Sequence, residues 1–404
     1  EMKKVLMLGA GYGNIALLTT INRDVFSQAE FSLINNTSYH YKTIALHDVA
    51  SGKHDKSVLF PLQEILDERV NLIQDSVVSI DSKSVKCKNA EYEYDYLVIG
   101  LGFSSDSFGI PGVGVYTQSI VSYDSAKNIY KNIEEKLQAY INDKDSKNLV
   151  FVVCGGGFTG IEFAGSLAQE IKKQCETRGI DFGLVKIYCI EAMPKILPMF
   201  SENLMQLGLT KLKELGIIVL TSSKILECKM GAVVIERDGK NEEILANTII
   251  WTAGVKGNEV IANSSFFKSG RSKVEVDSHL QPINQENEMN NIFVLGDCAA
   301  LKDEKTGRFY PPTAQLAQQQ GEYLAQTLET LLYAEQKGEV LQKELIPQFE
   351  FILRGSICSI GAGYAIGVIG EKEVSGYIAN AAKWLVESKW NYKLGGFSYV
   401  FKGD

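Results

Sequence analysis

The chain has 404 residues, which is too long for one ordinary hydrophobic core, so we expect two or three domains. Hydrophobic residues make up 45% of the sequence and charged residues 22%, a composition typical of soluble globular proteins. The net charge of -8 at pH 7 disfavours binding to nucleic acid and gives no general attraction to anionic lipid.

Seven cysteines are present, an odd number, and no two of them form a C-x-x-C pair. This pattern predicts neither a disulfide framework nor a metal site, and it favours a reducing cytosol. No long apolar segment follows the N-terminal lysines, so we expect no signal peptide. No stretch approaches the roughly 18 apolar residues of a membrane-spanning helix, so any membrane contact is expected from one side.

The chain opens with a pattern typical of a βαβ unit. Residues 5–8 form a short apolar run that ends at Gly9, which predicts a buried parallel strand. A helical pattern follows over residues 14–23, and residues 31–34 predict a second strand.

The same layout returns near the middle of the chain, so the architecture is duplicated. A strand predicted over residues 149–153 leads into a glycine cluster, a helix over 159–175 and a strand over 185–190. Further apolar strands end in glycine turns that let the backbone approach a ligand, and they are predicted at residues 96–99, 249–251 and 292–295.

The first glycine cluster reads Gly9-Ala10-Gly11-Tyr12-Gly13-Asn14. The dinucleotide fingerprint G-x-G-x-x-G uses its first glycine for a tight turn and its second to admit a pyrophosphate to a helix N-terminus. Asn14 stands at the third glycine position, and Asn35 stands where the ribose-binding acid is expected. The alternative interpretation is a glycine-rich turn without a ligand.

The second cluster reads Gly155-Gly156-Gly157-Phe158-Thr159-Gly160 and matches the fingerprint without a mismatch. Glu191 closes the following strand. A carboxylate at this place accepts hydrogen bonds from the ribose hydroxyls and repels a 2′-phosphate, so we favour NADH over NADPH. Alternatively, Glu191 is a solvated strand end. Two nucleotide sites in one chain suggest one nicotinamide and one flavin.

Two polar features stand close to these motifs. Glu162 lies on the first turn of the second predicted helix, where a carboxylate either complements the helix dipole or acts at the junction of nicotinamide and flavin. Gln315 and Gln319 are four residues apart and share one helix face. Amide side chains can donate to a carbonyl ligand, whereas the alternative is an exposed polar helix.

Taken together, the motifs resemble the type II (non-proton-pumping) NADH:quinone oxidoreductases of bacteria, within the pyridine nucleotide-disulfide oxidoreductase superfamily. The matching strings run in family order over nearly the whole chain. They are Gly9-Ala10-Gly11-Tyr12-Gly13, Ser38-Tyr39-His40-Tyr41, Gly157-Phe158-Thr159-Gly160-Ile161-Glu162-Phe163, Glu191-Ala192-Met193-Pro194-Lys195, Leu197-Pro198-Met199-Phe200-Ser201, Trp251-Thr252-Ala253-Gly254-Val255, Gly296-Asp297-Cys298 and Ala314-Gln315-Leu316-Ala317-Gln318-Gln319.

The resemblance implies two cofactor sites and a quinone site. The residues implied for FAD are Gly9, Ala10, Gly11, Tyr12, Gly13, Asn35, Asn36, Thr43, Val77, Gly102, Gly296, Asp297 and Ala314. Those implied for NADH are Gly155, Gly157, Gly160 and Glu191, with Glu162 as the acid at the NADH–flavin interface. Those implied for the quinone are Gln315, Gln319 and Lys383.

The implied reaction is oxidation of NADH through FAD, with two-electron reduction of a membrane quinone and no proton pumping. The implied fold is α/β, with two Rossmann-like dinucleotide-binding domains and a C-terminal membrane-associating region. We expect an FAD domain at residues 1–120 and 256–335, an NADH domain at 121–255 and a membrane-anchoring or dimer region at 336–404.

The C-terminal region combines aromatic residues with lysines in the strings 383–386, 389–394 and 397–402. Tryptophan, tyrosine and lysine favour the headgroup level of a bilayer, so we expect peripheral attachment to the cytoplasmic face of the cell membrane. The alternative is a dimer interface or ordinary core. Both can hold, because the resemblance also implies a homodimer.

Two other functions stay open on the sequence alone. A sulfide:quinone reductase resembles this chain but needs a cooperating cysteine pair, for which Cys154 and Cys358 offer no matching set. A non-catalytic FAD- and NADH-binding membrane scaffold is the other alternative, and the Gln315 and Gln319 pair argues against it.

Overall fold

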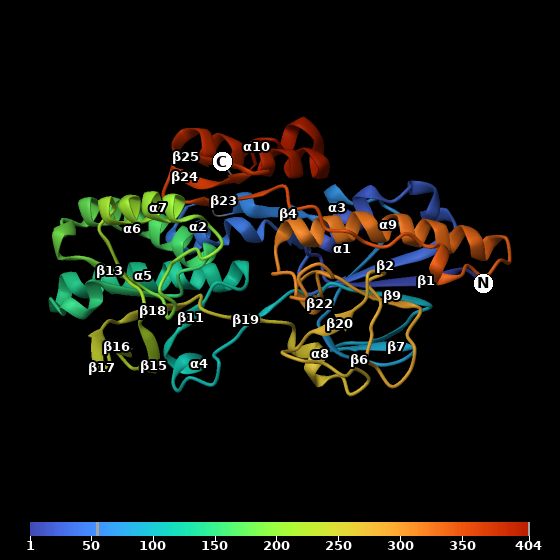
Figure 1. Cartoon of the computed structure of the whole chain (residues 1–404), viewed down its shortest axis with the longest axis horizontal. Helices are drawn as coiled ribbons and strands as arrows, with labels where there is room; N and C mark the ends of the chain where they lie inside the picture. The colour runs from blue at the N-terminus through green and yellow to red at the C-terminus, as the bar shows by residue number, and fades with distance from the viewer. Residues whose placement is uncertain (54–55, 403–404) are drawn as a thin grey trace.

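The computed structural model describes residues 1–53 and 56–402, and Figure 1 shows two lobes side by side beneath a C-terminal layer. The first lobe is built on a parallel sheet in the order β21-β9-β1-β2-β5. Its apolar strands are covered on both faces, which explains their short continuous hydrophobic runs. The strands are β1 (Lys3–Leu8), β2 (Ala29–Asn35), β5 (Asn71–Gln74), β9 (Tyr96–Ile99) and β21 (Ile292–Val294).

The second lobe repeats this design with a parallel sheet in the order β11-β18-β12-β13-β14. The duplication predicted from the sequence is therefore confirmed. The strands are β11 (Gln118–Ser119), β12 (Val150–Cys154), β13 (Lys186–Ile190), β14 (Ile217–Leu220) and β18 (Thr248–Trp251). Its helices are α5 (Tyr123–Asp143), α6 (Phe158–Arg178) and α7 (Glu202–Glu214).

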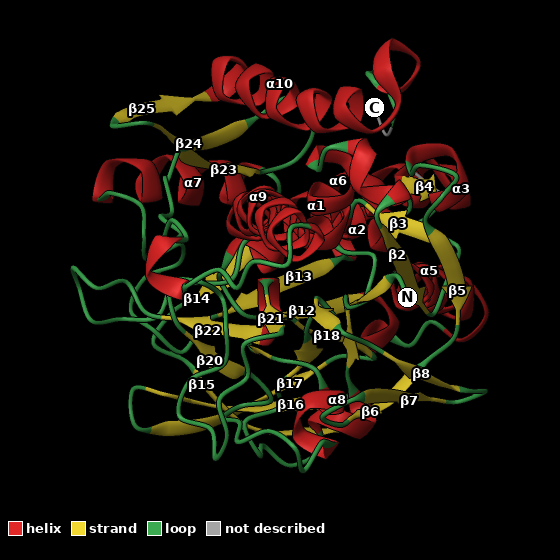
Figure 2. Ribbon diagram, turned by 90° about the vertical axis from the view of Figure 1, so that its right-hand side faces the viewer, coloured by secondary structure: helices red, strands yellow, loops and turns green. Residues whose placement is uncertain are grey.

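A three-stranded antiparallel meander accompanies each sheet, below the sheets in Figures 1 and 2. The first contains β6 (Val77–Ile80), β7 (Ser84–Cys87) and β8 (Glu91–Glu93), and the second contains β15 (Lys224–Lys229), β16 (Ala232–Arg237) and β17 (Lys240–Leu245). Smaller elements are β3 (Tyr39–Tyr41), β4 (Leu59–Pro61), β20 (Val274–Val276), β22 (Ala299–Leu301), α2 (Leu46–Ser51), α3 (Leu62–Ile65), α4 (Val113–Tyr116) and α8 (Glu259–Asn263).

The chain passes between the lobes along the antiparallel pair β10 (Ser104–Ser105) and β19 (Val255–Lys256). β11 already pairs with the second sheet, slightly before the boundary expected at residue 121. The chain crosses back along β19, near residue 256. The first lobe is therefore discontinuous in sequence, since β21 returns to its sheet.

Helices α1 (Tyr12–Thr20) and α9 (Ala314–Gln336) pack closely in the first lobe. A Cβ built on Gly321 of α9 stands 2.0 Å from the carbonyl oxygen of Gly13, and one built on Gly13 stands 2.3 Å from Leu295 Cδ1. Gly321 therefore requires glycine for this packing, whereas a side chain on Gly13 would meet the end of the Leu295 side chain. Gly13, expected at the FAD pyrophosphate, thus also lies in the contact between the two helices.

The C-terminal layer consists of an antiparallel sheet and helix α10 (Gly376–Gly395), which lies above the junction of the lobes in Figure 1. The strands are β23 (Gly355–Ser359), β24 (Ala365–Ile369) and β25 (Lys372–Ser375), and the short helix η8 (Gly396–Tyr399) follows α10. No described helix combines the length and apolar character that a membrane crossing requires.

Trp390 corrects one expectation about this layer. It was predicted among the membrane-facing aromatics, but only 7% of it is exposed and it packs in the core of the first lobe. Its indole Nε1–H donates to His40 Nε2 at 3.2 Å, and its ring lies against Tyr12 and His40. Trp390 thus fastens α10 to the first lobe.

His40 is held neutral in this contact. Its Nδ1 lies 2.8 Å from the carbonyl oxygen of Ala10, which fixes Nδ1 as the donor and leaves Nε2 to accept from Trp390. Burial lowers the pKa of His40 from 6.5 to about 4, although the bond to Ala10 opposes this shift.

The unfolded state therefore binds the His40 proton more tightly than the folded state does. We expect stability to fall as the pH drops from about 6.5 to about 4, by about 3 kcal/mol from this group alone. Urea unfolding at several pH values checks this, with His40→Gln as the comparison. A variant that keeps the wild-type pH dependence excludes His40 as its source.

Candidate active site

The residues expected to bind FAD gather at one edge of the first sheet. Gly9 follows β1, Asn35 ends β2, Val77 follows β5, Gly102 follows β9 and Gly296 follows β21. Because all five strands are parallel, these positions lie at the carboxyl edge, where α/β sheets bind ligands.

The turn after β1 can admit a pyrophosphate. Gly9 has φ +89, and a Cβ built on it stands 2.1 Å from the carbonyl oxygen of Gly100, so only glycine fits. Gly11 caps α1 with extended backbone, and no described side chain caps this helix. The first backbone N–H groups of α1 are thus left for an anion, which fits the FAD pyrophosphate.

The two asparagines that depart from the fingerprint stabilise this turn. Asn14 is fully buried, and its Nδ2 donates to the carbonyl oxygens of Leu8 at 2.9 Å and Gly9 at 2.8 Å. Asn35 Oδ1 accepts from the Ala10 N–H at 3.0 Å. The asparagines that stand in place of the glycine and the acid of the standard pattern thus hold the turn by hydrogen bonds. A ribose contact by Asn35 stays a prediction.

The far side of the expected flavin site is formed by the turn after β21 and the start of α9. Gln320 is buried, and its Oε1 accepts from the Gly296 N–H at 2.8 Å. Burial raises the pKa of Asp297, while the charge of Lys273 opposes the shift. Ala314 begins α9 beside this turn, whereas Thr43 begins the short helix η2 (Thr43–Ala45) and Asn36 is exposed.

The second fingerprint occupies the matching edge of the second sheet. Gly155 has φ +117, and a Cβ built on Gly160 stands 1.9 Å from the carbonyl oxygen of Gly155, so both positions require glycine. Gly157 has no atom within 4 Å of a built Cβ and caps α6, again without a described side-chain cap. This open, bare N-terminus fits the NADH pyrophosphate.

Glu191 ends the strand beside this turn. Its carboxylate accepts from the Gly156 N–H at 3.0 Å and from the Met193 N–H at 2.8 Å. These bonds orient the carboxylate at the carboxyl edge next to the fingerprint.

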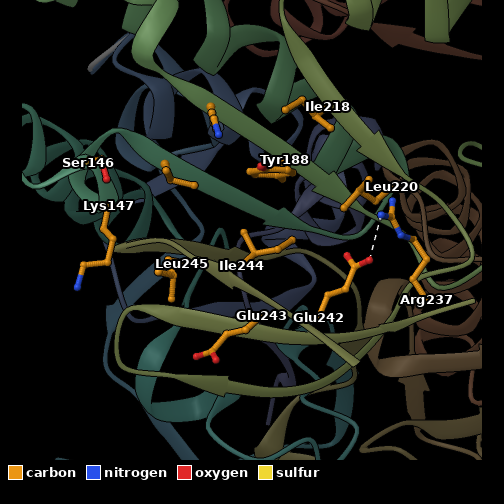
Figure 3. A pocket seen from close by; sticks show the side chains of 12 residues that line it. Ser146, Lys147, Tyr188, Ile218, Leu220, Arg237, Glu242, Glu243, Ile244 and Leu245 are labelled. Carbon is orange, nitrogen blue, oxygen red and sulfur yellow. Dashed lines mark hydrogen bonds and ion pairs between the residues drawn. The ribbon is translucent and has the colours of Figure 1, made fainter. Parts of the chain in front are cut away.

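A separate groove of about 550 Å³ lies between the second sheet and its meander (Figure 3). It is lined by Val150 and Lys186 at the amino-terminal ends of β12 and β13, and by the Arg237–Glu242 ion pair at 3.2 Å. No residue of either fingerprint lines it. It therefore lies away from the expected nucleotide edge.

Glu162 joins the second lobe to the C-terminal layer. Its Oε2 accepts from the Ser359 N–H at 3.1 Å and from Ser359 Oγ at 2.6 Å, and it forms an ion pair with Lys383 of α10. Burial raises the pKa of Glu162, but the charges of Lys383 and His47 outweigh it, so this pKa lies below its usual value. Glu162 is thus held as a carboxylate.

Lys383 is also held charged. Burial lowers its pKa, but the neighbouring carboxylates of Glu162 and Glu387 outweigh this effect, so its pKa lies above its usual value. Its Nζ also lies 3.1 Å from Ser359 Oγ. A buried acid and a partly buried base therefore share a hydroxyl partner at the junction of the lobes.

Gln315 and Gln319 share one face of α9, as predicted, and both bind backbone. Gln315 accepts from the Arg354 N–H at 2.7 Å and donates to the Gly355 carbonyl at 3.1 Å. Gln319 accepts from the Ile352 N–H at 3.0 Å and donates to the Ile352 carbonyl at 2.8 Å. The two amides thus hold the segment that leads into β23, while a direct quinone contact stays a prediction.

Comparison with known proteins assigns the fold and the family. Residues 3–321 match the family described as Pyridine nucleotide-disulphide oxidoreductase. The Type II NADH:quinone oxidoreductase of Staphylococcus aureus (strain MSSA476) is 35% identical over 410 residues, which cover 100% of this chain and 98% of that relative. The chain belongs to the type II NADH:quinone oxidoreductase family. The family predicted from the motifs is thereby confirmed.

Solved structures share the fold of this family member. NDH2 from Plasmodium falciparum in complex with NADH matches with a TM-score of 0.88 and 20% identity, over 100% of this chain and 97% of that chain. The sulfide:quinone oxidoreductase of Aquifex aeolicus matches with a TM-score of 0.75 and 21% identity, over 97% and 91% of the two chains. At these identities the likeness shows the dinucleotide-binding flavoprotein fold.

The cysteines of this type II family member do not favour the sulfide-dependent alternative. All seven lie in the described residues, where each is a buried free thiol. Burial raises the pKa of Cys154 and of Cys358 well above the usual value. A thiol that resists ionisation is a poor nucleophile, so neither residue is suited to the thiol–disulfide exchange that a sulfide-oxidising cysteine pair requires.

Several residues of the site were not predicted from the sequence. Ser359 and Gln320 complete hydrogen bonds to Glu162 and to the turn after β21, and Lys42 is a buried cation near α10. Gln320 carried a signal, since it lies one residue after Gln319 in the glutamine string. Ser359 and Lys42 carried none, because their partners are distant in sequence.

Proposed function

We propose that this protein oxidises NADH and reduces a membrane quinone, with FAD between the two substrates and without proton pumping. One observation carries the proposal. Each of two parallel sheets presents, at its carboxyl edge, a glycine turn and a helix N-terminus that no described side chain caps. Two such sites in one chain fit one flavin and one nicotinamide.

FAD, when bound, supplies the two-electron chemistry that connects NADH to the quinone. Gly9 and Gly11 hold its pyrophosphate, while Gly155 and Gly157 hold that of NADH. Glu191 orients the NADH ribose. Gln315 and Gln319 fix the segment beside the quinone. The Glu162–Lys383 ion pair relays protons to the quinone.

Anaerobic addition of NADH to the purified flavoprotein tests this proposal. We expect the flavin absorbance to bleach with NADH, to bleach weakly with NADPH and to recover on addition of a soluble quinone. Bleaching without recovery assigns a different acceptor. Bleaching by sulfide favours the sulfide:quinone alternative, and no bleaching favours a non-catalytic scaffold.

Glu191 is expected to determine the choice of nicotinamide. We predict that Glu191→Gln raises the ratio of kcat/KM for NADPH over NADH roughly tenfold, because it removes the charge that repels a 2′-phosphate. Stopped-flow bleaching with each nucleotide measures this ratio. Glu214→Gln, at an exposed position of α7, is the control, and an unchanged ratio in Glu191→Gln assigns the discrimination elsewhere.

We also propose that α10 and the residues after it rest on the surface of the membrane, on its cytoplasmic face. Large apolar side chains stand exposed along this segment, at Tyr377, Ile378, Leu385, Val386, Tyr392, Phe397 and Phe401. An exposed apolar patch of this kind fits the headgroup boundary of a bilayer. The same face is available for a homodimer, which analytical ultracentrifugation tests.

Charges on this face are expected to weaken membrane binding. We predict that Leu385→Glu with Val386→Glu lowers the fraction bound to vesicles at least about tenfold, because two apolar contacts become charged. Vesicle co-sedimentation measures the fraction. Met230→Glu is the matched control, since Met230 is 84% exposed at the β15–β16 turn, on the opposite side of Figure 1. Equal loss in the control argues against this face.

A further inference from the structure

Helix α10 carries two oppositely charged side chains one turn apart, and each pairs with a different lobe. Lys383 pairs with Glu162 of α6 in the second lobe. Glu387 Oε2 lies 3.3 Å from Nζ of Lys42, which follows β3 in the first lobe. Residues four apart on a helix are neighbours on one face. The charges therefore alternate in a row across the junction of the lobes.

Lys42 is the least exposed member of this row. Only 1% of its side chain is exposed, against 19% for Glu387, and among the described residues no group accepts a hydrogen bond from its Nζ. Its backbone is fixed, because its N–H donates to the Val58 carbonyl at 2.9 Å. Burying a cation without a counter-ion is costly, so the Glu387 carboxylate offsets the cost of burying the Lys42 charge.

Glu387 thereby stands between two lysines, and Lys383 stands between two carboxylates. The row contains two positive and two negative charges, so it is neutral as a whole. Among the described residues, the polar or titratable groups that face it include His47 of α2, which pairs with Asp48, as well as Cys358 and Ser359 of β23 and Tyr12 of α1. Lys383 pairs with Glu162 and also faces the Glu387 carboxylate, so it connects the Lys42–Glu387 pair to Glu162.

We propose that Lys42 and Glu387 are positioning residues for quinone reduction: their ion pair sets the charge state of the Glu162–Lys383 pair. This inference rests on the proposed function, in which that pair lies beside the quinone. Two-electron reduction of a quinone to a quinol takes up two protons. The rate of this step therefore depends on pH through the groups that exchange protons at the site.

The test compares Lys42→Met, Glu387→Gln and the double variant in the full-length, FAD-loaded protein. Reoxidation of the reduced flavin by a soluble quinone is followed against pH. Removing the Lys42 charge makes the site more negative, so we expect the rate profile to move to higher pH by about one unit. Removing the Glu387 charge moves it to lower pH. The double variant, again neutral, returns to the wild-type profile.

A purely structural role gives a different pattern. Shifts of the same sign in both single variants, or unchanged profiles, overturn the inference. Glu322→Gln is the control, because it removes one charge from the exposed Lys393–Glu322 pair, which joins α10 to α9 at 3.4 Å. Its profile is expected to match that of the wild type.

A second measurement is independent of quinone. Urea unfolding of the three variants gives a double-mutant cycle, in which we expect each single variant to be destabilised and the double variant to regain most of the loss. If the losses in free energy of unfolding simply add in the double variant, Lys42 and Glu387 are not coupled and the inference is overturned. If the wild type is not reoxidised by any quinone, the proposed function fails, while the cycle still decides whether Lys42 and Glu387 act as a unit.

Discussion

Glu162→Gln is expected to slow reoxidation of the reduced flavin by quinone about 100-fold, while reduction by NADH changes only a few-fold. The carboxylate contacts Ser359 and Lys383, which both belong to the C-terminal layer. This placement favours the quinone side of the flavin. Glutamine keeps the shape of the side chain but cannot exchange a proton or balance Lys383.

Stopped-flow measurement of the two half-reactions separates these effects. Glu176→Gln is the matched control, because Glu176 lies on the same helix and is exposed. A large loss in the NADH half-reaction instead places Glu162 at the nicotinamide–flavin junction, the role that the family resemblance implies. The half-reaction that slows more thus decides whether Glu162 acts on the quinone side of the flavin or at the nicotinamide–flavin junction.

The glycine motifs could be predicted because they express local geometry. A Cβ on Gly9 or Gly160 meets a backbone oxygen at about 2 Å, and Gly155 has φ +117 with a built Cβ 2.8 Å from Ala253 Cα, so glycine is required at fixed positions of the motif. The parallel strands were equally clear, since short apolar runs bounded by glycine turns are typical of a buried sheet.

Partners across the chain could not be predicted. Lys42 and Glu387 belong to elements at opposite ends of the sequence, and no periodicity connects them. Gln315 and Gln319 illustrate the same limit. Their spacing correctly predicted a shared helix face, but the backbone of Ile352–Gly355 that they bind follows only from the fold.

Trp390 shows why composition misplaces a residue. Aromatic and basic side chains mark a membrane surface, but the same residues also pack helices onto a core. The burial of Trp390 against His40 and the exposure of Leu385 and Val386 on the same helix arise from helical phase. That phase was not decisive in the sequence, because α10 is apolar on several sides.

The second large effect is expected at the two glycines that cap the fingerprint helices. Gly157→Val should raise the KM for NADH roughly 100-fold, because its side chain occupies the space where a pyrophosphate approaches α6. The backbone of Gly157 has φ -81, and nothing lies within 4 Å of a built Cβ, so valine fits the folded chain. FAD content and thermal stability should remain at the wild-type level.

Gly11→Val is the counterpart in the first lobe. Gly11 has φ -78, and its built Cβ is 3.9 Å from the Gly100 carbonyl oxygen, so the chain should fold but lose FAD. Flavin absorbance per protein and the apoprotein Tm measure the two effects, with Gly114→Val as the control at an open position. Loss of FAD in Gly157→Val, or retention of FAD in Gly11→Val, contradicts the assignment of one cofactor to each lobe. Retention of FAD in Gly157→Val together with its loss in Gly11→Val means that each helix N-terminus binds its own dinucleotide.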